Sequence, residues 1–163
     1  MIEIAPVQLE NDMEKVLFVI QKSFLTVAKD FNLTRENAPT NAAFLTMDQL
    51  RTSIANNLDL YIAKEQAEIV GCVGIQPGKN DGEYYVERLA VLPEYRHNGL
   101  GKKLLRKAIL EIKNRKAKRI SIGIINENTV LKEWYRGNGF KEYGTKRFDH
   151  LPFTVCFMGL ELG

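Results

Sequence analysis

The chain has 163 residues, of which 45% are hydrophobic and 26% charged, with a formal net charge of +3 at pH 7. This length fits one domain, residues 1–163, whose core can fold without disulfides or metals. No apolar run approaches the roughly 18 residues that a membrane-spanning helix needs, and the N-terminus lacks the pattern of a secretory signal. These features argue against a membrane protein and predict a globular cytoplasmic one.

Two cysteines, Cys72 and Cys156, lie inside apolar runs. We expect both to be buried free thiols in a reducing cytosol, because two thiols in such positions do not make a disulfide framework. No group of His, Cys, Asp and Glu residues has the spacing of a metal site, so we expect no metal.

Apolar periodicity predicts alternating strands and helices along the chain. A strand at Ile2–Leu9 comes first, followed by a helix at Met13–Lys29 that Asn11 or Asp12 would cap. The other predicted helices run from Ala42 or Met47 to about Asn56, from Leu100 to about Lys116 and over Thr129–Arg136. The other predicted strands are Leu58–Lys64, Ile69–Gln76, Glu83–Leu92, Arg119–Ile125, Phe140–Phe148 and Phe153–Leu160. This order predicts a mixed α/β sheet protein with helices on both faces.

Charge is distributed unevenly along the chain. From Arg96 to Arg119 there are ten Lys or Arg residues and one acid, Glu111, which gives this stretch a net charge of +9 and the remainder −6. Such a basic belt suits an anionic ligand at one place and a cationic one at another, or simply forms a solvated helix face.

The most informative stretch is Leu89–Leu105, in which an apolar strand leads through a turn with Gly99 and Gly101 into a helix. The first N–H groups of a helix have no intrahelical partner, and the helix dipole favours negative charge there. Glycines let the backbone approach a phosphate closely. The turn is neither a GxGxxG nor a Walker sequence, but its position between strand and helix predicts a diphosphate site.

The spacing Arg96-x-x-Gly99-x-Gly101 after an apolar strand resembles the acyl-CoA-binding core of the GNAT N-acetyltransferase superfamily. A second element of that superfamily follows the next strand as an Asn, a Tyr and a Gly-Phe pair, here Asn128, Tyr135 and Gly139-Phe140. The resemblance covers nearly all of the chain. It implies a mixed, mostly antiparallel central sheet with helices on both faces, in which two splayed strands form an acyl-CoA cleft.

The resemblance also implies an activity, namely transfer of an acetyl group from acetyl-CoA to a primary amine of a small molecule or peptide by direct attack in a ternary complex. The strand backbone would pair with the pantetheine arm, a backbone N–H near Leu89 would polarise the thioester carbonyl, and the turn would hold the pyrophosphate. The implied cofactor-binding residues are Leu89, Ala90, Val91, Arg96, His97, Asn98, Gly99, Leu100, Gly101 and Asn128.

Two residues are catalytic candidates. By its position in the second element, Tyr135 would protonate the departing CoA thiolate, although it could equally be a core aromatic beside Trp134. Glu87 would be the general base, because an amine is protonated at neutral pH and a carboxylate among apolar neighbours can have a raised pKa. Strict alternation puts Glu87 on the same face as Leu89 and Val91; the alternative is that Glu87 only pairs with a cation.

Other hypotheses remain open. The basic helix could bind nucleic acid, but its apolar stripe needs burial and it carries no aromatics for base stacking. A CoA-binding regulator without catalysis is the third possibility. The acceptor pocket is expected in residues 23–57 and 148–152, where the loop Asn32–Pro39 has no assigned chemistry. The resemblance also allows a homodimer.

Overall fold

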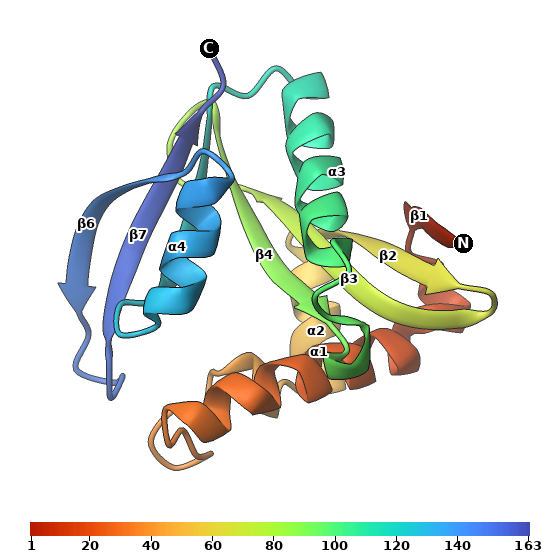
Figure 1. Cartoon of the computed structure of the whole chain (residues 1–163), viewed down its shortest axis with the longest axis horizontal. Helices are drawn as coiled ribbons and strands as arrows, with labels where there is room; N and C mark the ends of the chain where they lie inside the picture. The colour runs from red at the N-terminus through yellow and green to blue at the C-terminus, as the bar shows by residue number, and fades with distance from the viewer.

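One sheet of seven strands runs through the whole molecule (Figure 1). The structure is a computed structural model that describes residues 1–163. The strand order is β1-β2-β3-β4-β5-β7-β6, and every neighbouring pair is antiparallel except β4 and β5. The strands are β1 (Ile2–Pro6), β2 (Asp59–Glu65), β3 (Glu68–Pro77), β4 (Glu83–Val91), β5 (Arg119–Ile125), β6 (Lys141–Arg147) and β7 (Thr154–Glu161). The predicted mixed, mostly antiparallel α/β architecture is confirmed.

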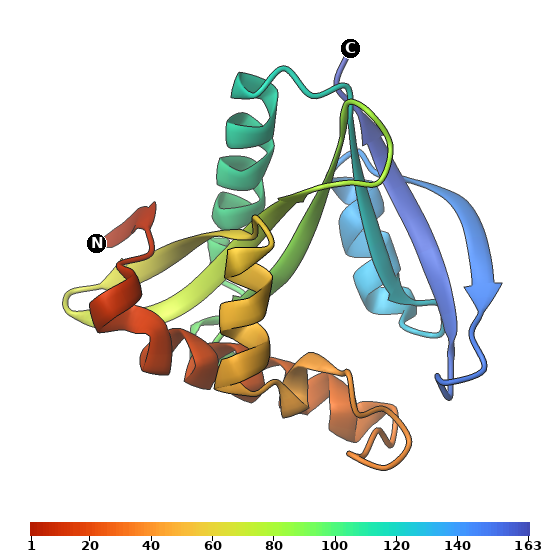
Figure 2. The ribbon, with the colours of Figure 1, turned by 180° about the vertical axis from the view of Figure 1, so that it is seen from behind.

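Helices cover both faces of this sheet, as predicted. Figures 1 and 2 show α1 and α2 on one face and α3 and α4 on the other. The helices are α1 (Leu9–Asp30), α2 (Met47–Ala55), α3 (Leu100–Asn114) and α4 (Thr129–Gly137), with short 3-10 turns at Ala42–Phe44 and Pro93–Tyr95. None of them combines the length and the hydropathy that a membrane crossing requires.

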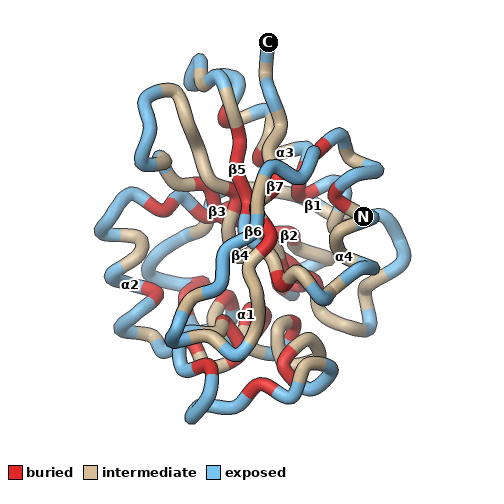
Figure 3. Tube along the Cα trace, turned by 90° about the vertical axis from the view of Figure 1, so that its left-hand side faces the viewer, coloured by how far each residue is buried: buried red, intermediate tan, exposed pale blue.

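Each face of the sheet has its own apolar core. The first core packs α3 and α4 against the sheet and includes Val86, Val91, Leu104 and Tyr135. The second packs α1 and α2 against the other face and includes Ile20, Leu50, Cys72 and Ala90. Figure 3 shows buried residues gathered on inner strands such as β5, while exposed residues dominate the outer loops. The apolar face predicted for α3 is buried at Leu100, Leu104, Leu105, Ala108 and Ile112, and Ile109, predicted for the same face, is partly buried.

The start of α1 differs from the sequence prediction. The strand ends at Pro6, and the helix begins at Leu9 rather than at Met13. Neither Asn11 nor Asp12 is the N-cap, because Gln8 has the extended backbone of that position and Asp12 Oδ2 accepts its N–H at 2.8 Å from within the first turn. An acidic residue placed there also suits the positive end of the helix dipole.

The feature that positions the site is the separation of β4 from β5. These two strands pair in parallel only over Glu83–Tyr85 and Arg119–Ser121. Beyond that point β4 stays paired with β3, and β5 stays paired with β7, so the two facing edges separate as they run toward α1 (Figure 2). The splayed strands implied by the family resemblance are therefore present.

A β-bulge in β4 corrects the prediction of strict alternation. The register with β3 shifts between Cys72 and Gly74, opposite Arg88, which has a left-handed φ of 55°. Because a bulge inserts one extra residue, the alternation changes phase. Val86 and Leu89 both pack into the α3-side core, three positions apart. Glu87 therefore does not share a face with Leu89 and Val91 and lies on the α1 side.

Candidate active site

A cleft of about 1080 Å³ occupies the space between the diverging strands. Its walls come from β4, β5, the C-terminal half of α1, the start of α3 and one side of α4. Ten of the twelve residues predicted from the sequence line it: Glu87, Leu89, Val91, Arg96, His97, Gly99, Leu100, Gly101, Asn128 and Tyr135. The other two do not, since Ala90 is buried in the α1-side core and Asn98 is exposed outside the cleft.

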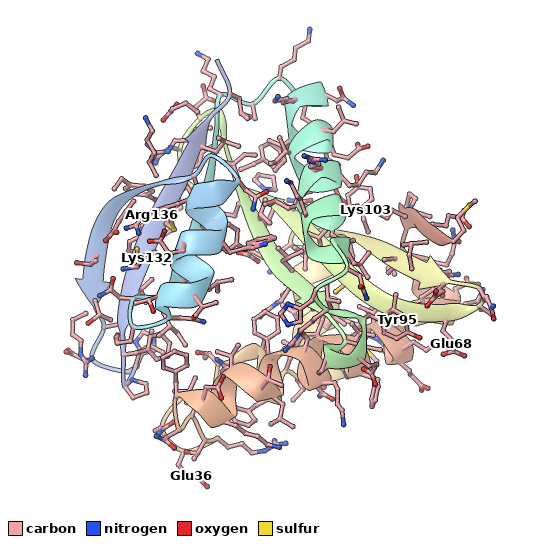
Figure 4. The ribbon with its side chains drawn as sticks, in the orientation of Figure 1. Glu36, Glu68, Tyr95, Lys103, Lys132 and Arg136 are labelled. Atoms are coloured by element: carbon pink, nitrogen blue, oxygen red, sulfur yellow. The ribbon has the colours of Figure 1, made fainter.

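The first turn of α3 opens onto the cleft without a cap of its own. Gly99 is the N-cap, with the left-handed φ of 80° that glycine adopts without strain, and no side chain accepts from the first helical N–H groups. The first turn holds no acid and two exposed lysines, Lys102 and Lys103 (Figure 4). By contrast, α2 is capped by Thr46 and α4 by Asn128. The start of α3 therefore presents unsatisfied donors and the charge of Lys102 to the cleft, whereas Lys103 is not among the cleft-lining residues.

Arg96 fastens the turn before α3 to α1. Its guanidinium donates to the Val91 carbonyl at 3.2 Å, to Thr26 Oγ1 at 3.1 Å, and to the Ser23 carbonyl at 2.8 Å and Oγ at 3.2 Å. The Val91 N–H donates to the same Ser23 hydroxyl at 3.2 Å. The end of β4 is thus held by a side-chain network where β5 would otherwise pair. Arg96 acts here by positioning the turn, and burial lowers the pKa of its guanidinium.

Tyr135 is both a core aromatic and part of the cleft wall. Its ring makes edge contacts with Trp134 and Phe140, with centroids 5.0 and 5.4 Å apart. The side chain is only 6% exposed, and this burial raises the pKa of its phenol above the ordinary value of 10.0. The phenol therefore keeps its proton at neutral pH, which is the state that a general acid requires.

Asn128 caps α4 at the edge of the cleft. Its Oδ1 accepts the Leu131 N–H at 3.1 Å, so Asn128 is the N-cap of α4. The side chain also lines the cleft, so its amide N–H groups remain available to a ligand.

Glu87 lies on the α1 side of β4 and lines the cleft. Burial raises the pKa of its carboxyl, and the nearby positive charge of Arg88 opposes this shift without cancelling it. A carboxylate with a raised pKa is a better proton acceptor than an ordinary glutamate. The alternative reading, a glutamate that only forms an ion pair, finds no support, because Glu87 is in none of the seven ion pairs.

Both cysteines are buried and free, as predicted. Burial raises the pKa of the Cys72 thiol to about 12 and also raises that of Cys156. Since the thiolate is the nucleophile, neither residue suits an acyl-enzyme. No group of three or more His, Cys, Asp and Glu side chains is arranged to hold a metal.

A second, smaller cavity of about 310 Å³ adjoins the cleft on the α1 side. Phe24, Ala38 and Leu151 are among its lining residues, and they come from the two segments expected to shape an acceptor pocket, while Phe153 lies just after the second segment. The loop Asn32–Pro39 forms part of the wall.

Polar residues hold that loop in place. Asn37 and Thr34 exchange side-chain-to-backbone bonds at 2.7 and 3.1 Å, while Leu33 and Ala38 are buried against Ile125. The loop therefore has a structural role, with no reactive group assigned to it.

Some cations of the basic belt have partners within the chain. Arg115 pairs with Asp59 at 2.8 Å, Lys107 with Glu111 at 2.9 Å, and Arg119 stacks 4.2 Å above the Tyr143 ring. On α4, Lys132 and Arg136 face β6, where both pair with Glu142 (Figure 4). The cations without such contacts lie at the start of α3 and also farther along, at Arg106, Lys113, Lys116 and Lys118. Only the start of α3 lines the cleft, which favours a local anion there.

Several residues of the site escaped the sequence analysis. Ser23 and Thr26 meet Arg96 across roughly seventy positions of sequence. Arg88 lines the cleft because of the bulge in β4, which the sequence pattern does not indicate. Trp134 lies against Gly101, where a Cβ would come within 3.6 Å of its ring. The left-handed conformation at Arg88 has no glycine to signal it.

A family model described as an acetyltransferase (GNAT) domain matches residues 56–142, which is more than half of the chain. The matched segment includes β4, the turn before α3, and α4.

Solved structures share this fold over nearly the whole length. The PaiA N-acetyltransferase of Thermoplasma acidophilum, in complex with coenzyme A, is 21% identical, covers 99% of each chain and has a TM-score of 0.75. The ribosomal-protein-S18-alanine N-acetyltransferase of Escherichia coli is 16% identical, covers 100% of this chain and 95% of its own, and has a TM-score of 0.78. A GNAT family acetyltransferase of Elizabethkingia anophelis with acetyl-CoA bound is 19% identical, covers 99% and 98%, and has a TM-score of 0.69.

The network around Ser23 predicts energetic coupling between α1 and the turn. Ser23→Ala and Arg96→Gln remove groups of the same cluster, so their effects on the free energy of unfolding should deviate from additivity by about 0.5–3 kcal/mol. Chemical denaturation of both single variants and the double variant measures this coupling. The control is Ser53→Ala on α2 combined with Arg96→Gln, which should be additive within about 0.5 kcal/mol. Additivity in the Ser23 pair would contradict the network.

Proposed function

The chain belongs to the GNAT acetyltransferase family, and we propose that it transfers an acetyl group from acetyl-CoA to a primary amine of a small molecule or peptide. The observation that carries the proposal is the opening between β4 and β5, which begins at Tyr85 and Ser121 and lies beside the uncapped start of α3. An elongated cofactor with a diphosphate needs both features at once.

The residues present fit the CoA part of this substrate. Backbone N–H groups from His97 to Gly101 and the charges of Lys102 and Lys103 suit the pyrophosphate. Gly101 adds no side chain on the cleft wall. Two similar folds contain coenzyme A or acetyl-CoA, which supports the same ligand here.

The pantetheine arm would pair with the free edge of β4. Because Ser23 and Arg96 already bond the N–H and carbonyl of Val91, the main pairing falls to the backbone of Leu89. The amide of Asn128 approaches from the opposite wall. The proposed pairing with the pantetheine arm is therefore limited mainly to Leu89, whereas the sequence analysis assigned it to all of Leu89–Val91.

The proposed reaction is direct transfer. The amine arrives as an ammonium group and loses one proton to Glu87, directly or through water. Its nitrogen then forms a bond to the acetyl carbon while the carbon–sulfur bond breaks, and the nitrogen releases its second surplus proton. The departing thiolate takes a proton from the Tyr135 phenol, which is replenished from solvent. The products are an amide, the CoA thiol and one net proton.

Direct attack is preferred to an acyl-enzyme because neither cysteine can act as the nucleophile in the cleft. Both cysteines are absent from its walls and their thiols have raised pKa values. Binding both substrates together supplies the orientation that the reaction needs.

Calorimetry with acetyl-CoA and thiol release with a panel of amines test the proposal. Gly101→Ala should weaken acetyl-CoA binding by about tenfold or more, because it puts a methyl group on the cleft wall where the diphosphate must approach. Gly137→Ala on α4 is the matched control, since both are helical glycines whose replacement favours the helix and neither Cβ would clash. No binding below about 1 mM would contradict the proposal, and binding without thiol release would indicate a CoA-binding regulator.

Tyr135→Phe removes the proposed proton donor and keeps the ring. We expect kcat to fall by about 10²-fold or more while acetyl-CoA affinity changes little, because the phenol acts only as the thiolate departs. Steady-state kinetics and calorimetry separate the two quantities. Tyr95→Phe, outside the cleft, should leave both unchanged. An unchanged kcat in Tyr135→Phe would remove this residue from the mechanism.

The raised pKa of Glu87 predicts the pH dependence. The base works only when deprotonated, so kcat/KM, calculated per concentration of the ammonium form that Glu87 deprotonates, should fall as pH drops through a pKa above the ordinary glutamate value of about 4.3. Glu87→Gln should remove this acidic limb and lower kcat/KM by about 10²-fold or more. Glu68→Gln at the β2–β3 turn serves as the control (Figure 4). A limb that persists in Glu87→Gln would assign it to another group.

A further inference from the structure

The bulge in β4 places two charged residues of opposite sign side by side. On both sides of it, Val86 and Leu89 face the α3-side core, while Ala90 faces the α1-side core. Glu87 and Arg88 are the two residues between the α3-side positions, and both line the cleft. A carboxylate and a guanidinium are therefore neighbours on the same side of the strand, which regular alternation would forbid.

Arg88 forms no ion pair, although its charge lies near the Glu87 carboxyl. None of the seven ion pairs includes it, and its Nε is buried without a hydrogen-bond acceptor. The other buried, unbonded guanidinium Nε belongs to Arg119, which is nevertheless compensated by Glu161 at 3.7 Å and by the Tyr143 ring. A buried donor on a cation is costly to leave unsatisfied, so an anionic acceptor beside Arg88 would relieve that cost.

Arg88 also connects the two cavities. It lines the cleft and the smaller 310 Å³ cavity, whose other walls include Phe24, Leu151, Phe153 and Val155. The volume is at the low end for ligand pockets, and its walls are mainly apolar. Among the residues lining this smaller cavity, Arg88 is the single charged one.

We propose that Arg88 binds the carboxylate of the acceptor while Glu87 receives the proton of its amine, so that the acceptor is a small free amino acid with an apolar side chain. This inference rests on the proposed function and names its substrate class. Adjacent charges of opposite sign complement an amine and a carboxylate joined by one or two carbons. The apolar cavity would accept the side chain. An N-terminal residue within a protein has no carboxylate at this distance, so it lacks the group that Arg88 would bind.

The test compares free amino acids with their α-carboxamides. Acetyl-CoA is supplied to the full chain with leucine or leucinamide, and with phenylalanine or phenylalaninamide, and thiol release gives kcat/KM per concentration of the ammonium form of each acceptor. We expect a ratio of acid to amide of at least about tenfold, since a charge-assisted pair is lost in the amide. In Arg88→Gln the ratio should approach one, mainly through a higher KM for the acid. Arg88→Lys keeps the charge and should retain a ratio well above one.

Arg51→Gln, on the exposed face of α2 and outside both cavities, is the matched control and should keep the wild-type ratio. A thermal melt of each variant checks folding; if Arg88→Gln does not fold, the wild-type and Arg88→Lys ratios decide. Transfer to amines with no preference for the acid, or a preference that survives in Arg88→Gln, would overturn this inference and leave the proposed function standing. No transfer to either series or to simple alkylamines would overturn both.

Discussion

The site depends on how the free edge of β4 is held. A strand that leaves its neighbour exposes N–H and carbonyl groups, and such an edge either finds other partners or collapses onto the next strand. Here the Ser23 hydroxyl and the Arg96 guanidinium bond both backbone groups of Val91 at the open end. The cleft therefore stays open because Ser23 of α1 and Arg96 of the turn, rather than β5, bond the backbone of Val91.

The two halves of the chain form different walls of the cleft. The N-terminal half contributes α1 and the hairpin that anchors β4, while the C-terminal half contributes β5, α4 and the strand pair β6–β7. The cleft lies where these halves separate. The α3-side core continues behind both walls, since it includes Val91 of β4 as well as Ile122 of β5 and Tyr135 of α4.

Local patterns predicted most of the fold and part of the site. The strand, turn and helix around Gly99 and the apolar stripe of α3 depend on neighbours close in sequence, and the structure has them as expected. The predicted start of α1 is too late because an acidic residue such as Asp12 is favoured both at the N-cap and within the first turn of a helix. The contacts of Ser23 with Arg96 could not be predicted, since nothing local marks two residues that meet only after the sheet forms.

The bulge at Arg88 was the most consequential omission. Strict alternation is the default for a strand, and a left-handed residue without glycine or asparagine gives no warning of an exception. Because of one inserted residue, Glu87 lies on the opposite face of β4 from Leu89. The candidate base is therefore on the α1 side of the strand, and not on the side that the sequence predicts. The residue type of Glu87 indicated its chemistry, but its neighbours in space required the structure.

The same bulge changes how variation along β4 should be read in related chains. Before Arg88 the even-numbered residues face α3, and after it the odd-numbered ones do. A single insertion or deletion in this strand would therefore exchange the residues that face α1 with those that face α3, without altering any residue type. Two relatives with a glutamate at the position of Glu87 but a bulge at a different place in β4 would present that carboxylate on opposite faces of the sheet. A difference in substrate could then arise from the position of the bulge alone.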